Sequence, residues 1–149
     1  MLLLLVAGPA EVVVSPVWAQ GAVDAKAALD CRGWTTRPLA QTEMNICSTR
    51  EVEAQRSKLE RLVGDLREKL AVKQPSQWAT LSANQKSWRD FVENDCEWEA
   101  AFSDGGSIQP LARNQCLAAA TAQRINRLRV VLCEGEGATG ECPESKKYE

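Results

Sequence analysis

The chain has 149 residues and a mass of 16.4 kDa, which is enough for one compact domain. Its 44% apolar and 26% charged residues are typical of a folded protein, and its net charge of -2 argues against a nucleic-acid binder, which needs an excess of Lys and Arg. The chain contains no His, so Ser-His-Asp and Cys-His catalytic sites and His-ligated metal centres are excluded. We expect no cofactor and no metal.

Residues 1–19 are expected to be a cleaved secretory signal peptide. Residues 1–6 are rich in Leu, and residues 17–19 place small or β-branched side chains where signal peptidase cleaves. Two features are irregular, because no Lys or Arg precedes Lys26 and because Glu11 interrupts the apolar stretch. A retained membrane anchor is the alternative, although a span needs about 20 apolar residues in a row. The protein is therefore expected to be periplasmic or secreted, with no membrane span after cleavage.

Six cysteines in a short exported chain predict a disulfide framework. They are Cys31, Cys47, Cys96, Cys116, Cys133 and Cys142. A zinc site is the alternative, but it normally has paired ligands two to four residues apart, and the closest cysteines here are nine apart. About 15 pairings are possible. The simplest scheme joins neighbours, 31 to 47, 96 to 116 and 133 to 142, at about 2–4 kcal/mol of stabilisation per bridge.

Three segments have helical periodicity and no useful stretch alternates as a strand does, so the predicted class is all-α. The first helix should begin near Thr42, a good N-cap, and end just after Lys73, before the helix-breaking Pro75. At about 30 residues it should be the longest. Its expected inward stripe is Met44, Ser48, Val52, Gln55, Leu59, Leu62, Val63, Leu66 and Leu70.

The second helix should begin near residue 77 or 80 and end at Phe102, before a Gly-Gly turn. At 100° per residue its large apolar side chains share one arc, which we expect to face the core: Leu81, Trp88, Phe91, Val92, Trp98 and Phe102. The third helix should begin near residue 108 or 110. Its expected buried positions are Leu117, Ala120, Thr121, Ile125, Leu128, Val131 and Leu132.

These helices are expected to form one compact, disulfide-braced three-helix domain within residues 20–132. The short connection between the first and second helices predicts an antiparallel pair, with the third helix packed across it. Residues 20–41 and the tail, residues 133–149, are rich in turn formers and charges and should be irregular.

A series of short motifs occurs in a fixed order along residues 30–132. They are Gln41-Thr42-Glu43-Met44-Asn45 between Cys31 and Cys47, Leu81-x-x-x-Gln85-x-x-Trp88 before Cys96, Gly105-Gly106-Ser107, Cys116, Thr121, Arg124 and Leu128. This series resembles the LprI-type lysozyme-inhibitor family. One departure is Phe91-Val92-Glu93, where the family usually carries an aromatic-Arg-Asp triplet. The cysteines at 133 and 142 lie outside the family pattern.

The resemblance implies an exported helical module of the bacterial envelope that binds and inhibits lysozyme. An inhibitor of a basic muramidase should present an acidic surface. Four carboxylates lie within about 60° of each other on the second helix and are the candidate partner-binding residues: Asp90, Glu93, Glu97 and Asp104. An ordinary solvated helix face is the alternative explanation of these charges.

Two other functions stay open. An envelope interaction or stability module without a lysozyme partner would have the same features. A glycosidase would need only two carboxyl groups, but no spacing singles out a pair, and a deep cleft is hard to build from three helices. We therefore expect no enzyme activity and no catalytic residue.

One buried ion pair is predicted between the second and third helices. Asp95 falls within the apolar arc of the second helix, and Arg124 falls on the apolar stripe of the third. A lone buried charge would cost several kcal/mol, so the simplest partner for each is the other. Gln85 could satisfy a leftover donor. The alternative is that Arg124 reaches a binding surface.

Overall fold

A computed structural model describes residues 29–133 and 142–149, and the predicted signal peptide lies outside them. By its internal contacts the chain divides into residues 1–31 and residues 32–149, and every helix below belongs to the second unit. None of the helices in the described ranges is both long and apolar enough to cross a bilayer.

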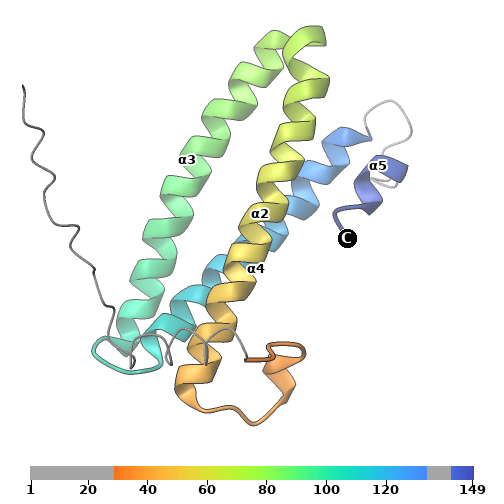
Figure 1. Cartoon of the computed structure of the whole chain (residues 1–149). Coiled ribbons are helices and arrows are strands. Elements are labelled where there is room, and N and C mark those ends of the chain that lie inside the picture. Colours follow the sequence, from red (N-terminus) through yellow and green to blue (C-terminus); the bar gives the residue numbers. More distant parts are fainter. Residues whose placement is uncertain (1–28, 134–141) are drawn as a thin grey trace, which may run out of the picture. The chain divides into compact units, whose positions relative to one another are not determined.

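The described part of the chain contains only helices and connecting segments (Figure 1). In chain order the elements are η1 (Trp34–Thr36), α2 (Gln41–Lys73), α3 (Pro75–Ala100), η2 (Ala101–Ser103), α4 (Gln109–Leu132) and α5 (Pro143–Lys146). No strand occurs among the described residues, and the predicted all-α class is confirmed. With 33 residues, α2 is the longest helix, as predicted.

A single residue, Gln74, separates α2 from α3. Its N–H donates to the carbonyl of Leu70 at 2.7 Å and closes the last turn of α2. Pro75 then occupies the first turn of α3, where a missing N–H costs nothing and the fixed φ suits a helix. The proline that ends one helix therefore begins the next, slightly earlier than predicted, and the two helices run antiparallel (Figure 1).

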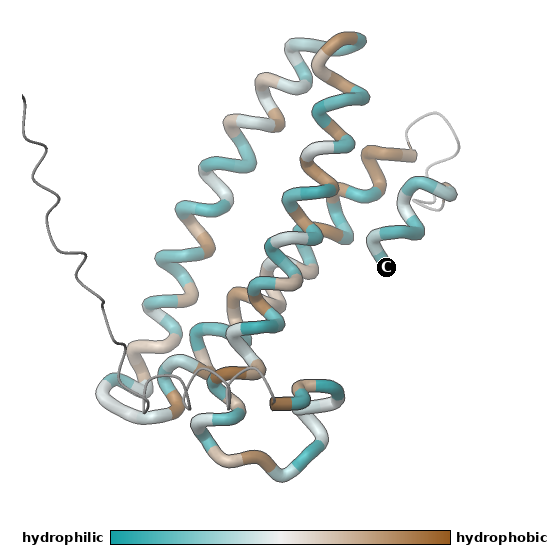
Figure 2. Tube along the Cα trace, viewed as in Figure 1, coloured by the Kyte–Doolittle hydropathy of each residue, from teal (hydrophilic) through white to brown (hydrophobic). Residues whose placement is uncertain are grey.

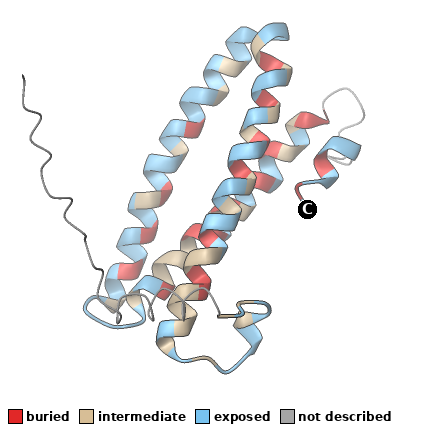
Figure 3. Ribbon diagram, viewed as in Figure 1, coloured by how far each residue is buried: buried red, intermediate tan, exposed pale blue. Residues whose placement is uncertain are grey.

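The core lies where α4 packs against α2 and α3, and the buried residues fall on the facing sides of these helices (Figure 3). Hydrophilic residues recur along all three, so each helix is amphipathic (Figure 2). One buried cluster comprises Leu59, Leu62, Leu66, Ile125, Leu128, Leu132 and Tyr148. A second comprises Val52, Val92, Cys96, Leu117 and Ala118. The predicted stripes of the first and third helices are thus largely the buried ones.

The predicted inward face of the second helix is right only in part. Val92 is buried, and Leu81 and Trp88 pack against the core. The buried positions of α3 are Gln85, Val92, Cys96 and Ala100, and their centre lies about 95° around the helix axis from the predicted arc. Three aromatic residues expected in the core point to solvent instead: Phe91 is 63% exposed, Trp98 66% and Phe102, in η2, 79%. We call these three residues the aromatic stripe.

The disulfides explain part of this rotation. The Cys96–Cys116 bond joins α3 to α4 with a Cα–Cα distance of 5.5 Å, so the Cys96 side of α3 must face α4. Cys133 is bonded to Cys142, and Cys31 and Cys47 are both disulfide-bonded as well. No cysteine of the described ranges is free, and the two pairs within residues 96–142 are those that the spacing predicts.

The C-terminal tail, expected to be irregular, contains the short helix α5 and packs against the core. Tyr148 is 4% exposed and belongs to the first cluster. Its hydroxyl donates to Asp65 Oδ2 of α2 at 2.7 Å, and Lys147 forms an ion pair with the same carboxylate. The Cys133–Cys142 bond joins the end of α4 to the start of α5. Residues outside the family pattern therefore complete the core.

The docking of the tail on the core should weaken at acid pH. The Lys147 ammonium, and after it the Tyr148 hydroxyl, lowers the pKa of Asp65 by hydrogen bonding to its charged form. A lowered folded-state pKa stabilises the fold above the unfolded value of about 4, and this contribution is lost as the pH falls through the folded value.

Tyr148→Phe should therefore cost about 1 kcal/mol of unfolding free energy at pH 7 and progressively less below about pH 4, because a neutral carboxyl is the weaker acceptor. Urea unfolding of the wild type and Tyr148→Phe from neutral pH down to about pH 2 measures the difference. A difference that does not change with pH would contradict the role of Asp65.

Candidate functional site

A buried arginine lies at the contact between α3 and α4. Arg124 is 8% exposed, and its Nε donates to Gln85 Oε1 at 2.8 Å. Its Nη2 donates to Asn84 Oδ1 at 2.6 Å, and its guanidinium carbon lies 5.4 Å from the centre of a Trp88 ring. Asn84, Gln85, Trp88 and Arg124 thus form one cluster. In it the guanidinium contacts two amide oxygens and an aromatic ring rather than a carboxylate.

The predicted pair between Asp95 and Arg124 is wrong. Asp95 is exposed, and no carboxylate of the described chain lies within salt-bridge distance of Arg124. The physical reason is the rotation of α3, which brings Gln85 rather than Asp95 to face α4. Burial, with a smaller contribution from nearby Arg127, lowers the pKa of Arg124. The guanidinium still stays charged, since arginine does not deprotonate in proteins.

The four candidate partner-binding carboxylates do not form one free surface. Glu93 forms ion pairs with Arg56 of α2 and, at 2.7 Å, with Arg113 of α4. Glu97 binds the same Arg113 at 2.5 Å. Glu93 therefore links α3 to both α2 and α4, and Glu97 links α3 to α4. Asp90 pairs with Lys86, one turn away on α3, and Asp104 is exposed.

The acidic surface available to a partner is centred elsewhere on the same segment. Residues 90–104, which we call the acidic segment, contain six Asp and Glu and no Lys or Arg. Asp95, Glu99 and Asp104 are exposed, and within the described ranges none of them forms an ion pair. Asp95 lies at the edge of the aromatic stripe, about 20° around the axis beyond Phe102, and Glu99 lies about 40° further on. Sequence reasoning missed this surface because it assigned the aromatic side chains to the core.

The cysteine spacing could have revealed that these aromatic side chains are exposed. A Cys96–Cys116 disulfide was the simplest pairing, and it requires Cys96 to face α4. At 100° per residue the members of the aromatic stripe lie about 120–160° around the axis from Cys96, so they cannot face α4 as well.

The departure from the family triplet is also explained. Val92 stands where the family usually has Arg, and it is 7% exposed, packed with Cys96 and Leu117. The neighbouring Glu93 keeps an acidic side chain and binds two arginines from other helices. Val92 therefore adds an apolar contact to the core.

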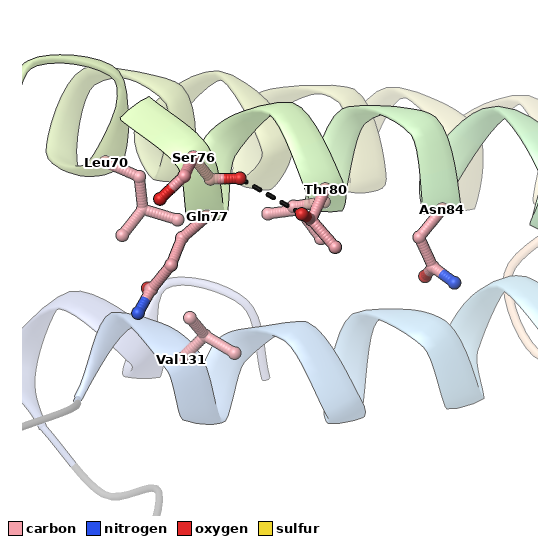
Figure 4. A pocket seen from close by; sticks show the side chains of 7 residues that line it. Leu70, Ser76, Gln77, Thr80, Asn84 and Val131 are labelled. Atoms are coloured by element: carbon pink, nitrogen blue, oxygen red, sulfur yellow. Dashed lines mark hydrogen bonds between the residues drawn. The ribbon is translucent and has the colours of Figure 1, made fainter. Parts of the chain in front are cut away.

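Among the described residues, two hollows lie beside α3. The smaller, about 430 Å³, is lined by side chains from the start of α3 and the end of α4, including Gln77, Asn84 and Val131 (Figure 4). The larger, about 560 Å³, lies between α2 and α3 beside Trp78 and contains two carboxylates, Glu60 and Glu93. Glu93 is already bound by two arginines. The described residues contain no group of three or more side chains suited to hold a metal.

The cluster around Arg124 should make a measurable contribution to stability. Arg124→Ala leaves the buried amide oxygen of Gln85 without a donor, so we expect a loss of about 2–3 kcal/mol in urea unfolding. A double-mutant cycle with Gln85→Ala should show a coupling of about 1 kcal/mol. The matched control is Asp95→Ala, at the position that the sequence predicted to pair with Arg124. It should change the free energy of unfolding by less than about 0.5 kcal/mol. Equal losses for Arg124→Ala and Asp95→Ala would contradict this assignment.

Comparison with known proteins agrees with the order of motifs. A family model described as lysozyme inhibitor LprI matches residues 31–128. No curated protein and no solved structure matches the chain. The matched region contains α2, α3, most of α4, the Cys96–Cys116 disulfide and the Arg124 cluster. The chain therefore belongs to the LprI lysozyme-inhibitor family.

Proposed function

We propose that this protein is a lysozyme inhibitor of the bacterial envelope, which binds the enzyme as a protein partner and catalyses no reaction itself. The observation that carries the proposal is the match of residues 31–128 to the family described as lysozyme inhibitor LprI. Export to the periplasm or beyond is part of the proposal. It is supported by the disulfides, which form and persist in oxidising compartments, and by the leader-like residues 1–19.

The charge distribution supports a basic partner. The acidic segment contributes Asp90, Asp95, Glu99 and Asp104 at the surface, and the chain as a whole has a net charge of -2. Such a surface attracts a basic lysozyme and accelerates association. Glu93 and Glu97 remain part of the proposed surface because they are partly exposed, although their charge is compensated by Arg56 and Arg113.

An envelope interaction or stability module without a lysozyme partner is the competing function. It would have the same helices, disulfides and tail. Only a direct assay with lysozyme separates the two functions.

The test is lysis of a cell-wall suspension by a basic lysozyme, followed by turbidity, with oxidised protein lacking residues 1–19. We expect near-stoichiometric inhibition at about 0.05 M ionic strength and several-fold weaker inhibition at about 0.5 M, because salt screens exposed charges that lie further apart than the Debye length. That length is about 10 Å at 0.1 M and shortens as the salt concentration rises. Lysozyme alone at each salt concentration is the control.

Two outcomes would contradict the proposal. Undiminished lysis in the presence of excess protein would favour the interaction module. Clearing of the suspension by the protein alone would show that it is an enzyme.

A further inference from the structure

We infer that the aromatic stripe of α3 and η2, together with the exposed carboxylates beside it, is the contact surface for a basic protein partner. Naming lysozyme as that partner rests on the function proposed above. The surface itself follows from the exposure, spacing and charge of the residues on this helix.

The stripe is a continuous apolar feature. Phe91, Trp98 and Phe102 are 63%, 66% and 79% exposed, and they are three of the six large hydrophobic residues that are exposed in the described ranges. At 100° per residue their directions differ by no more than about 40°, and they extend over about 16 Å of helix. The rings of Trp98 and Phe102 meet edge to face, with centroids 5.3 Å apart. Single exposed apolar residues are ordinary, but aligned aromatic residues are typical of protein–protein contacts.

The fold holds these side chains outward. Val92, Cys96 and Ala100 occupy the inward face of the same turns, and the Cys96–Cys116 bond prevents α3 from rotating about its axis. The stripe therefore cannot be buried by a small adjustment of the core. Its rings are displayed on a rigid helix, which lowers the entropy lost on binding.

The charges around the stripe select the partner. Asp95 lies between Phe91 and Trp98 along the helix, about 20° around the axis beyond Phe102, and Glu99 lies about 40° further in the same direction. Neither forms an ion pair within the described part of the chain. A basic surface would supply Lys and Arg, which pair with these carboxylates and also stack on aromatic faces. An anionic membrane would be repelled. A second copy of the chain, paired symmetrically, would bring acidic segment against acidic segment.

The experiment measures lysozyme affinity and inhibition separately on the full chain without residues 1–19. The test variants are Trp98→Ala, Phe102→Ala and the charge variant Asp95→Asn with Glu99→Gln. The matched control is Val72→Ala, which removes a side chain that is 86% exposed one residue from the end of α2. Circular dichroism and urea unfolding verify that each variant is folded.

We expect Trp98→Ala to raise the Kd about 30-fold or more, as a central aromatic contact does, and to weaken inhibition in parallel. The charge variant should raise the Kd and reduce its salt dependence, and Val72→Ala should change it less than about twofold. If the wild type binds lysozyme without inhibiting it and Trp98→Ala abolishes binding, the surface is supported and the proposed inhibitory function fails.

Three results would overturn the inference. If the wild type inhibits lysozyme and all three test variants do so equally well, the function stands and the surface is wrong. If the wild type does not bind lysozyme at all, both proposals fail. If size-exclusion chromatography with light scattering shows a dimer that Trp98→Ala dissociates, the stripe is a contact between two copies of the chain.

Discussion

The Cys96–Cys116 disulfide determines which side of α3 is available to other molecules. A disulfide brings two Cα atoms to within about 6 Å, so it sets not only the distance between α3 and α4 but also the rotation of α3 about its own axis. Once Cys96 faces α4, Val92 and Ala100 are buried with it, and the aromatic stripe must point outward. The most hydrophobic side of the second half of α3 is thereby left in solvent. Burial of those rings would require a different rotation of α3 about its axis, and the covalent bond prevents that rotation.

The same orientation accounts for the unusual environment of Arg124. With Gln85 facing α4, the guanidinium finds amide oxygens and the Trp88 ring rather than a carboxylate. Desolvation of this charge is unfavourable, and it lowers the pKa of Arg124. Neutral partners recover part of that free energy through charge-assisted hydrogen bonds. They also orient α3 relative to α4, because the planar guanidinium donates to Gln85 and Asn84 along fixed N–H directions.

Much of the fold could be predicted from the sequence, because α2 and α4 bury their most hydrophobic residues. Periodicity therefore located Leu59, Leu62 and Leu66, and Pro75 marked the boundary between two helices. Periodicity failed for α3, since its inward face contains Gln85, Cys96 and Ala100 while larger apolar residues lie outward. The tail could not be placed either. Its docking depends on Tyr148 and Lys147 meeting Asp65, a contact between residues far apart in sequence that no local pattern reveals.

This difference between buried and exposed residues has a consequence for specificity. Four of the motif residues that carry the family resemblance, Gln85, Trp88, Thr121 and Arg124, lie in the core or at its border, where they contribute to helix packing. Buried side chains cannot contact a partner. Recognition has to come from exposed residues, and the contact surface that we propose for this chain lies on the solvent side of α3. Members of one family could therefore keep the same scaffold and bind partners of different charge by changing this single face of one helix.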